Sequence, residues 1–393
     1  MLTTDDRRLT TDFVRVLPLV GVGFALRVLV IFYLVHVKPD ALSWGINEAG
    51  GIARWIVLKH SFSTPFHDAS GPTAWLGPIY PAAIALSYWI FGVATPASAL
   101  AMMIFNATCS ALAGWVVYAI AKRVMNDRAG LIAGWLWALS PYLMLMPFLL
   151  WDTSLAALVL GYAFLRTLEL DDNPLGDPGI RDWIICGAAW GFAGLVTPSL
   201  LIPLPFVLVY LAVRKERWMP SAALVGAAFL VLAPWLARDY VVFHRIFPVR
   251  SNGLAEIYFG NVGFDAHPLG PSMEYQRFGE VAFVTLYGSR LMEYVEQHPG
   301  KFVRDSLRRA VDFWFQPGGF WPLTLLIELA ALAALVLLFR RASHGVGLFL
   351  VMLAVYPLVY YASQVFSRFR HPIEPLLYGL AGCSLSQLRR TKS

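Results

Sequence analysis

Two carboxylates lie where apolar stretches of the sequence meet polar loops. Glu48 begins a helix-period pattern that continues through Ile52 and Ile56, and Asp152 lies between two apolar stretches, just before Thr153. A carboxylate placed there can act as a general base that takes a proton from a hydroxyl group. Each acid also has a structural interpretation. Glu48 can stabilise a helix N-terminus, and Asp152 can be the N-cap of a helix that begins at Thr153.

A second group of candidate residues is basic and lies inside or beside apolar stretches: Arg27, Arg238, Arg368, Arg370 and His371. Guanidinium groups bind phosphate through charge-assisted hydrogen bonds, so these residues are candidates for holding an anionic ligand. The alternative is a structural role. In that case the loop residues would be solvated loop ends with Asp239 or Glu374 as partners, and Arg27 would form an ion pair with another helix.

The composition indicates a membrane protein. Of the 393 residues, 58% are hydrophobic and 14% are charged, whereas a soluble domain has about 25% charged residues. The net charge of +6 comes with basic residues gathered in short loops, which is typical of membrane orientation signals and argues against nucleic-acid binding. The cysteines Cys109, Cys186 and Cys383 lie in apolar stretches, which argues against a disulfide framework or a metal site.

The apolar stretches predict about ten transmembrane helices. Their expected positions are 13–36, 97–121, 129–149, 151–168, 183–197, 199–213, 219–237, 321–339, 345–363 and 371–387. Basic residues follow every second span, at Arg123, Arg181, Arg217, Arg341 and Arg390. The positive-inside rule makes that side cytoplasmic. If Pro78–Gly92 also spanned, the later basic loops would lie outside, so we expect this segment to be re-entrant or juxtamembrane.

This topology divides the all-α chain into three parts. Residues 1–237 form an N-terminal transmembrane core whose first outer loop is 37–96. Residues 238–320 form an extracytoplasmic cap, and 321–393 contain the C-terminal transmembrane helices. The cap is partly helical, because a helix-period apolar stripe begins after His298. Its members are Phe302, Val303, Leu307, Ala310, Val311 and Trp314.

Six short motifs, in order, resemble those of the integral-membrane type C glycosyltransferases (GT-C), in particular the family-39-like, mannosyltransferase and aminoarabinose-transferase group. They are the Asn47-Glu48 acid site, the GPTAWLGPIYP loop, the Trp151-Asp152 pair, TPSLL, PWLARDYVVFHRIFPVRSNG, and SRFRHPIEPLL. The chain departs from the pattern at the first motif, where the family usually carries an adjacent Asp-Glu pair and this chain has Asn47-Glu48.

The resemblance implies a retained core of seven helices, an outer catalytic cavity and transfer of a sugar from a polyprenyl-phosphate donor. It assigns Glu48 as the base and Asp152 as a second acid in the same cavity. Asn47, Trp75 and Tyr80 would belong to the substrate-cavity loop, and the basic residues named above would bind the donor phosphate.

Several alternatives and open points accompany this interpretation. A carrier or flippase for a polyprenyl-linked glycan would use the same basic residues without a base, and a scaffolding protein would use the outer loops for docking. The sequence demands no metal or other cofactor, although it does not exclude a divalent ion. We expect an integral protein of a bacterial inner or plasma membrane, with the active site outside. Its partners would be the bilayer, the lipid-linked donor and an acceptor that the sequence does not name.

Overall fold

The computed structural model describes residues 4–42, 47–66, 71–171, 177–215, 218–263, 270–315, 320–341, 343 and 345–387. In this part of the chain helices dominate, and the β-structure is an isolated bridge between Ser63 and Pro72. The expected all-α architecture is confirmed. The basic loop positions Arg217 and Arg390 lie outside the described residues.

The first half of the chain contains, in order, α1 (Thr4–Val37), α2 (Glu48–Lys59), α3 (Ile79–Phe91), α4 (Pro96–Val124), α5 (Asp127–Leu139), α6 (Pro141–Leu145), α7 (Thr153–Asp171), α8 (Ile180–Val196) and α9 (Leu204–Lys215). The second half contains α10 (Trp218–Phe243), α11 (Gly253–Val262), α12 (Gly270–Phe278), α13 (Glu280–Gln297), α14 (Pro299–Trp314), α15 (Trp321–Arg340), α16 (Val346–Val355), α17 (Leu358–Ala362), α18 (Ser367–Arg370) and α19 (Glu374–Leu385).

Five described helices are long and apolar enough to cross a bilayer: Val16–Val37 of α1, together with α4, α7, α10 and α15. The pair α5 and Pro141–Phe148, which bends by 50°, would be a sixth span. Shorter apolar helices at Pro198–Val213 and Val346–Ala362 coincide with two more expected spans. The 13 residues of α3 extend about 20 Å, less than the roughly 30 Å of a hydrocarbon core. That α3 does not span stays a prediction.

The helices of the core pack closely around α4, which contacts α1, α5, α7 and α19. Small residues allow the closest approaches, as is usual between membrane helices. At Gly187 of α8 an added Cβ would lie 2.2 Å from the carbonyl oxygen of Leu224 in α10, and at Gly191 it would lie 2.7 Å from that of Ala228. Any side chain at these two positions would therefore push α8 and α10 apart.

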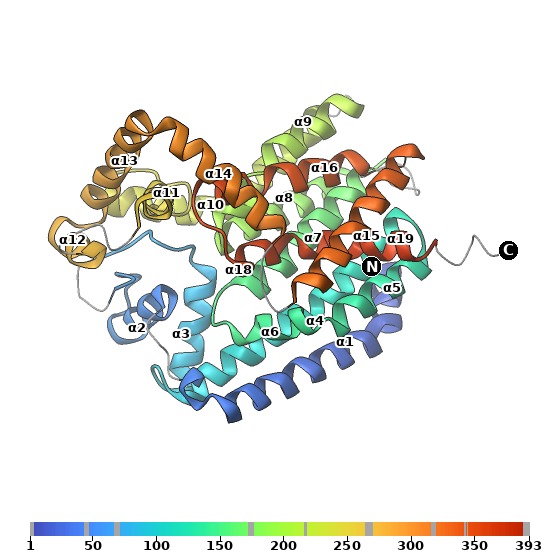
Figure 1. The fold of residues 1–393 in the computed structure, drawn as a ribbon, viewed down its shortest axis with the longest axis horizontal. Coiled ribbons are helices and arrows are strands. Elements are labelled where there is room, and N and C mark those ends of the chain that lie inside the picture. The colour runs from blue at the N-terminus through green and yellow to red at the C-terminus, as the bar shows by residue number, and fades with distance from the viewer. Residues whose placement is uncertain are drawn as a thin grey trace.

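The outer segments gather at one end of the molecule, where α2 and α3 lie near α11, α12 and α13 (Figure 1). A buried carboxylate joins the two outer segments. Glu280, at the start of α13, accepts hydrogen bonds from the Ala74 backbone N–H at 2.6 Å and from the Thr73 hydroxyl. The loop before α3 is thereby fixed to the cap.

Candidate functional site

A cavity of about 420 Å³ lies where the membrane helices meet the cap. Its lining comes from segments far apart in sequence: the start of α2, the start of α3, the loop before α7, the end of α8, α11, and the α17–α18 region. Four of the residues predicted from sequence line it, namely Glu48, Tyr80, Asp152 and Arg368. The folded chain thus brings the two predicted acids and one predicted arginine to a single cavity.

The side chain of Glu48 is available to the cavity because its neighbour performs the capping. Asn47 is the N-cap of α2, and its Oδ1 accepts a hydrogen bond of 2.7 Å from the Gly50 backbone N–H. The Asn47 amide also donates to the carbonyl oxygen of Leu150 at 2.7 Å, which fixes α2 to the loop before α7. Trp75 Nε1 donates to Glu48 Oε1 at 3.0 Å and orients the carboxylate.

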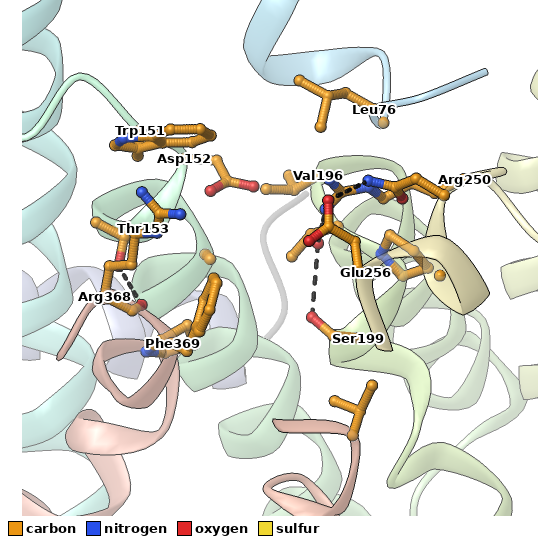
Figure 2. Close-up of a pocket in the computed structure, with 18 of the residues that line it drawn as sticks. Leu76, Trp151, Asp152, Thr153, Val196, Ser199, Arg250, Glu256, Arg368 and Phe369 are labelled. Carbon is orange, nitrogen blue, oxygen red and sulfur yellow. Dashed lines mark hydrogen bonds between the residues drawn. The ribbon is translucent and has the colours of Figure 1, made fainter. Parts of the chain in front are cut away.

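Asp152 and Arg368 lie on one side of the cavity, together with Trp151 (Figure 2). The loop that carries Arg368 is attached to the start of α7, because the Thr153 hydroxyl donates to the Arg368 carbonyl oxygen at 2.8 Å. Burial raises the pKa of Asp152, and the nearby guanidinium groups of Arg250 and Arg368 oppose this shift.

The guanidinium of Arg368 is held by aromatic rings. Its Cζ lies 4.1 Å from the ring centroid of Trp151 and 5.0 Å from that of Phe369. Its Nε is buried and has no hydrogen-bond partner among the described residues. Stacking on aromatic faces is a property of arginine that lysine does not share. The arrangement leaves hydrogen-bond donors at the cavity for an anionic ligand.

Tyr80 contributes its ring to the lining, while its hydroxyl connects α3 to α4. The Asn106 amide donates to the Tyr80 hydroxyl at 3.2 Å and to the carbonyl oxygen of Leu149 at 2.9 Å. One buried amide therefore binds both the start of α3 and the loop before α7, which are two walls of the cavity.

Sequence reasoning missed two charged residues of the lining, Arg250 and Glu256, which lie opposite Asp152 and Arg368 (Figure 2). Arg250 donates from Nε to the Trp75 carbonyl oxygen at 3.0 Å and from Nη1 to the Thr197 hydroxyl at 3.3 Å. Both residues lie within or next to the PVRSNG motif that entered the family resemblance. That motif was the available signal, because the cap sequence around it has no helical periodicity.

Glu256 is held by two side-chain amides, from Asn252 at 3.1 Å and from Gln364 at 3.3 Å. Burial, with a smaller contribution from the carboxylate of Glu48, raises its pKa to about 7, whereas Arg250 and Arg368 lower it. The charged residues of the lining are three acids and two arginines. No group of three or more metal-ligating side chains forms in the described part of the chain.

The raised pKa of Glu256 predicts a pH-dependent stability. In the unfolded chain the carboxyl has its ordinary pKa of 4.5. The folded protein therefore keeps a proton that the unfolded chain loses, and the free energy of unfolding falls as pH rises from about 4.5 through about 7. Glu256→Gln should flatten this part of the curve of Tm against pH. The exposed Glu293→Gln is the control, and an unchanged slope in Glu256→Gln would contradict the expectation.

Arg370 and His371 do not line the cavity, and their expected phosphate-binding role is revised. Arg370 is 2% exposed and forms ion pairs with Glu328 of α15 and with Glu374, the latter at 3.3 Å. His371 Nδ1 lies 2.9 Å from Glu374 Oε2, and its ring stacks on Trp137. The ion pairs of Arg370 and the hydrogen bond of His371 hold α15, α18 and α19 together. Glu374 is the partner that the structural alternative named, but both side chains are buried, whereas that alternative expected solvated loop ends.

Arg238 also lies outside the lining of the cavity. Its guanidinium donates to the carbonyl oxygens of Thr73 at 2.7 Å and Phe62 at 3.0 Å, and it forms an ion pair with Asp239 at 2.8 Å. It also lies over the ring of Trp235. These bonds hold the loop between α2 and α3 against α10. The expected role of Arg238 in binding the donor phosphate is therefore revised.

Arg27 is fully buried in the core, where protein groups satisfy it. It donates to the Ser110 hydroxyl at 2.8 Å and to the carbonyl oxygens of Gly23, Trp137 and Ala138 at 2.9, 3.1 and 3.3 Å. The last two carbonyls are at the end of α5, where positive charge is favourable. This arrangement is structural, and the expected role of Arg27 in phosphate binding is revised as well.

Comparison with known proteins agrees with this architecture. Residues 73–237 match the family model described as dolichyl-phosphate-mannose-protein mannosyltransferase. No curated protein sequence matches the chain significantly. The apo oligosaccharyltransferase of Archaeoglobus fulgidus is 16% identical with a TM-score of 0.56, over 95% of this chain and 50% of that one. The oligosaccharyltransferase AglB from Archaeoglobus fulgidus, in complex with an inhibitory peptide and a dolichol-phosphate, is 15% identical with a TM-score of 0.55, over 96% of this chain and 51% of that one.

This chain thus spans about half the length of those archaeal chains. ArnT from Cupriavidus metallidurans bound to undecaprenyl phosphate is 13% identical over 95% of this chain and 77% of that one, and its TM-score of 0.45 is too low to support an argument. The family model covers residues 73–237, and the likeness to the archaeal oligosaccharyltransferase shows a shared helical fold.

Proposed function

We propose that the protein transfers a sugar from a polyprenyl-phosphate donor to an acceptor hydroxyl outside the cytoplasm. The observation that carries the proposal is the convergence of Glu48, Asp152 and Arg368 from three distant segments on one cavity at the cap end of the membrane core. The family model that matches residues 73–237 describes a dolichyl-phosphate-mannose enzyme, and a structural relative binds dolichol-phosphate. Both support a lipid-phosphate donor.

The proposed chemistry is a single displacement. Glu48 takes the proton of the acceptor hydroxyl as its oxygen forms a bond to the anomeric carbon. The bond between that carbon and the phosphate oxygen breaks on the opposite face, so the configuration of the sugar inverts and polyprenyl phosphate leaves. Asp152 is a second acid beside the reacting centre, and Trp75 keeps the carboxylate of Glu48 oriented through its 3.0 Å hydrogen bond.

The leaving phosphate gains negative charge as its bond to the sugar breaks, and fixed positive charge near it lowers the barrier. Arg368 is suited to this role because it lines the cavity with its guanidinium stacked and its Nε unpartnered. Arg250, on the other side, is a second cation for the same charge. Of the five basic residues that the sequence suggested for the phosphate, Arg368 keeps this proposed role, and Arg250 is added to it.

The direct test is an assay of donor cleavage in nanodiscs. The purified protein is mixed with polyprenyl-phosphate donors that carry a labelled sugar, with and without an extract that supplies acceptors. Acceptor-dependent appearance of the label in a new product, with release of polyprenyl phosphate, is the expected result. Movement of the intact donor between leaflets without cleavage would instead identify a carrier.

Arg368→Ala is expected to weaken binding of polyprenyl phosphate by about ten-fold or more. A hydrogen bond to a charged group contributes about 1.5–3 kcal/mol, and roughly 1.4 kcal/mol corresponds to ten-fold in affinity. Arg245→Ala is the matched control, since Arg245 is an outer arginine that donates to Thr285 and does not line the cavity. Titration of both variants with polyprenyl phosphate in nanodiscs makes the comparison, and equal affinities would remove Arg368 from the phosphate site.

The proposal includes the orientation of the protein in the membrane. The alternation of basic loops predicts that α13 lies outside and that the end of α15 lies in the cytoplasm. Cysteines introduced at the exposed positions Glu293 and Arg341 report on these two sides. In intact cells an impermeant maleimide should label the cysteine at 293 and not the one at 341. The opposite pattern would invert the topology.

A further inference from the structure

One helix of the cap carries an apolar stripe that faces away from the rest of the protein. Along α14, Val303, Leu307 and Val311 follow one another at four-residue spacing, and Phe315 continues the series just past the helix end. Their exposed fractions are 56, 63, 57 and 62%. Four large apolar side chains aligned on one helix face form a contiguous patch, which soluble surfaces rarely expose without a partner.

A candidate membrane span follows the stripe along the chain. The candidate span α15 begins at Trp321, only six residues after Phe315. Outward-facing apolar side chains run along that span, including Trp321, Leu326 and Phe339, which are 54, 63 and 71% exposed. The apolar stripe of α14 is therefore followed, along the chain, by a candidate span whose outward side chains are also apolar.

Basic side chains border the stripe. Arg304 and Arg308 have side-chain exposures of 75 and 82% and lie one helical turn apart. Their ion pairs, with Asp305 at 3.8 Å and Asp312 at 3.9 Å, are long and exposed, so they are weak. A long arginine side chain can keep its stem on an apolar surface while the guanidinium reaches phosphate. Apolar residues bordered by such arginines are typical of helices that lie in a membrane interface.

The inner face of α14 is attached to elements that line the cavity. Arg309 donates to the Tyr361 carbonyl oxygen at 3.1 Å and to the Gly260 carbonyl oxygen at 2.7 Å. Trp314 Nε1 donates to the Tyr361 hydroxyl at 2.7 Å. Tyr361 belongs to α17 and Gly260 to α11, the helices that supply Tyr360 and Glu256 to the cavity.

We propose that α14 docks on the lipid surface at the cap end of the membrane. Its apolar stripe inserts at the level where headgroups meet acyl chains, and Arg304 and Arg308 contact lipid phosphates. The bilayer then supports α11 and α17 through Arg309 and fixes the height of the cavity above the lipid phosphates. This inference rests on the placement of α14 and does not depend on the proposed chemistry.

The test measures the depth of two labels on the same helix. Leu307→Cys places a nitroxide on the stripe, and Asp312→Cys places one on the polar face, where the native side chain is 45% exposed. The native cysteines Cys109, Cys186 and Cys383 are buried, so they leave the introduced site as the one labelled. Each labelled full-length variant is studied in phosphatidylcholine and phosphatidylglycerol nanodiscs by power-saturation EPR, with oxygen and a water-soluble nickel complex as relaxing agents.

The label at 307 should be relaxed several-fold more by oxygen than by nickel, and the label at 312 should show the reverse. Equal, high nickel accessibility at both positions would overturn the proposal. Spectral broadening at 307 that disappears on dilution with unlabelled protein would also overturn it, because a second copy of the chain would then cover the stripe. Global unfolding would also make both positions accessible to nickel, so each labelled variant is first required to match the circular dichroism spectrum and thermal transition of the wild type.

Discussion

Glu48→Gln is expected to reduce the rate of sugar transfer by about 100-fold or more while donor binding stays nearly unchanged. The amide has almost the shape of the carboxylate and can still accept the hydrogen bond from Trp75 Nε1. It cannot take a proton from the acceptor hydroxyl, so the loss falls on the chemical step. Turnover and polyprenyl-phosphate affinity, measured side by side in nanodiscs, separate the two effects.

Two further variants make this result specific. Asp152→Asn should reduce the rate of sugar transfer less than Glu48→Gln does if Asp152 only orients groups near the reacting centre. Glu293→Gln, on the exposed face of α13, should leave turnover unchanged. Near-wild-type turnover in Glu48→Gln would exclude Glu48 as the base and direct attention to Asp152, or to a carrier without a base.

Arg370→Ala is expected to lower the free energy of unfolding by about 3–5 kcal/mol. The substitution leaves the carboxylates of Glu328 and Glu374 buried without their shared cation, and this unpaired charge accounts for most of the cost. Unfolding in mixed micelles, followed by circular dichroism, gives the comparison with wild type.

The control for that experiment is an ion pair of the same chemistry on the surface. Arg308 lies 3.9 Å from Asp312, and its side chain is 82% exposed. Arg308→Ala should lower the free energy of unfolding by no more than about 1 kcal/mol, the upper end of the range for exposed ion pairs. Suppose that Arg370→Ala were as stable as Arg308→Ala and bound polyprenyl phosphate less tightly than the wild type. Arg370 would then be assigned to the phosphate-binding site after all.

The structure brings Glu48 and Asp152 to one cavity, and their catalytic roles stay predictions. Glu48 begins a helix in the first loop between expected spans, Asp152 lies where two expected spans meet, and Arg368 comes just before the last apolar stretch. Chain segments that leave a membrane on the same side are close in space, so the convergence of these residues on one cavity was predictable. The start of α14 after His298 was predicted on the same kind of evidence.

The partners Asp239 and Glu374 were named from the sequence because they are close along the chain, but the distant partners of the basic residues were not predictable. Arg370 pairs with Glu328, 42 positions earlier, and Arg238 binds the Thr73 carbonyl oxygen, 165 positions away. No local pattern distinguishes an arginine that is satisfied in this way from Arg368, whose Nε has no partner in the described structure. Arg250 was missed for the converse reason, since tertiary packing alone brings its loop to the cavity.

The hydrogen-bond partners of Arg27 make the membrane insertion of α1 depend on helices that are synthesised later. When α1 enters the bilayer, the partner within its own helix is the carbonyl oxygen of Gly23. The other acceptors lie on Ser110, Trp137 and Ala138, 83 to 111 residues further along the chain. Until α4 and α5 have been translated, the guanidinium is poorly compensated in the hydrocarbon. The first helix therefore depends on later ones for stable lateral insertion, and the early chain has reason to stay beside the insertion machinery until they arrive.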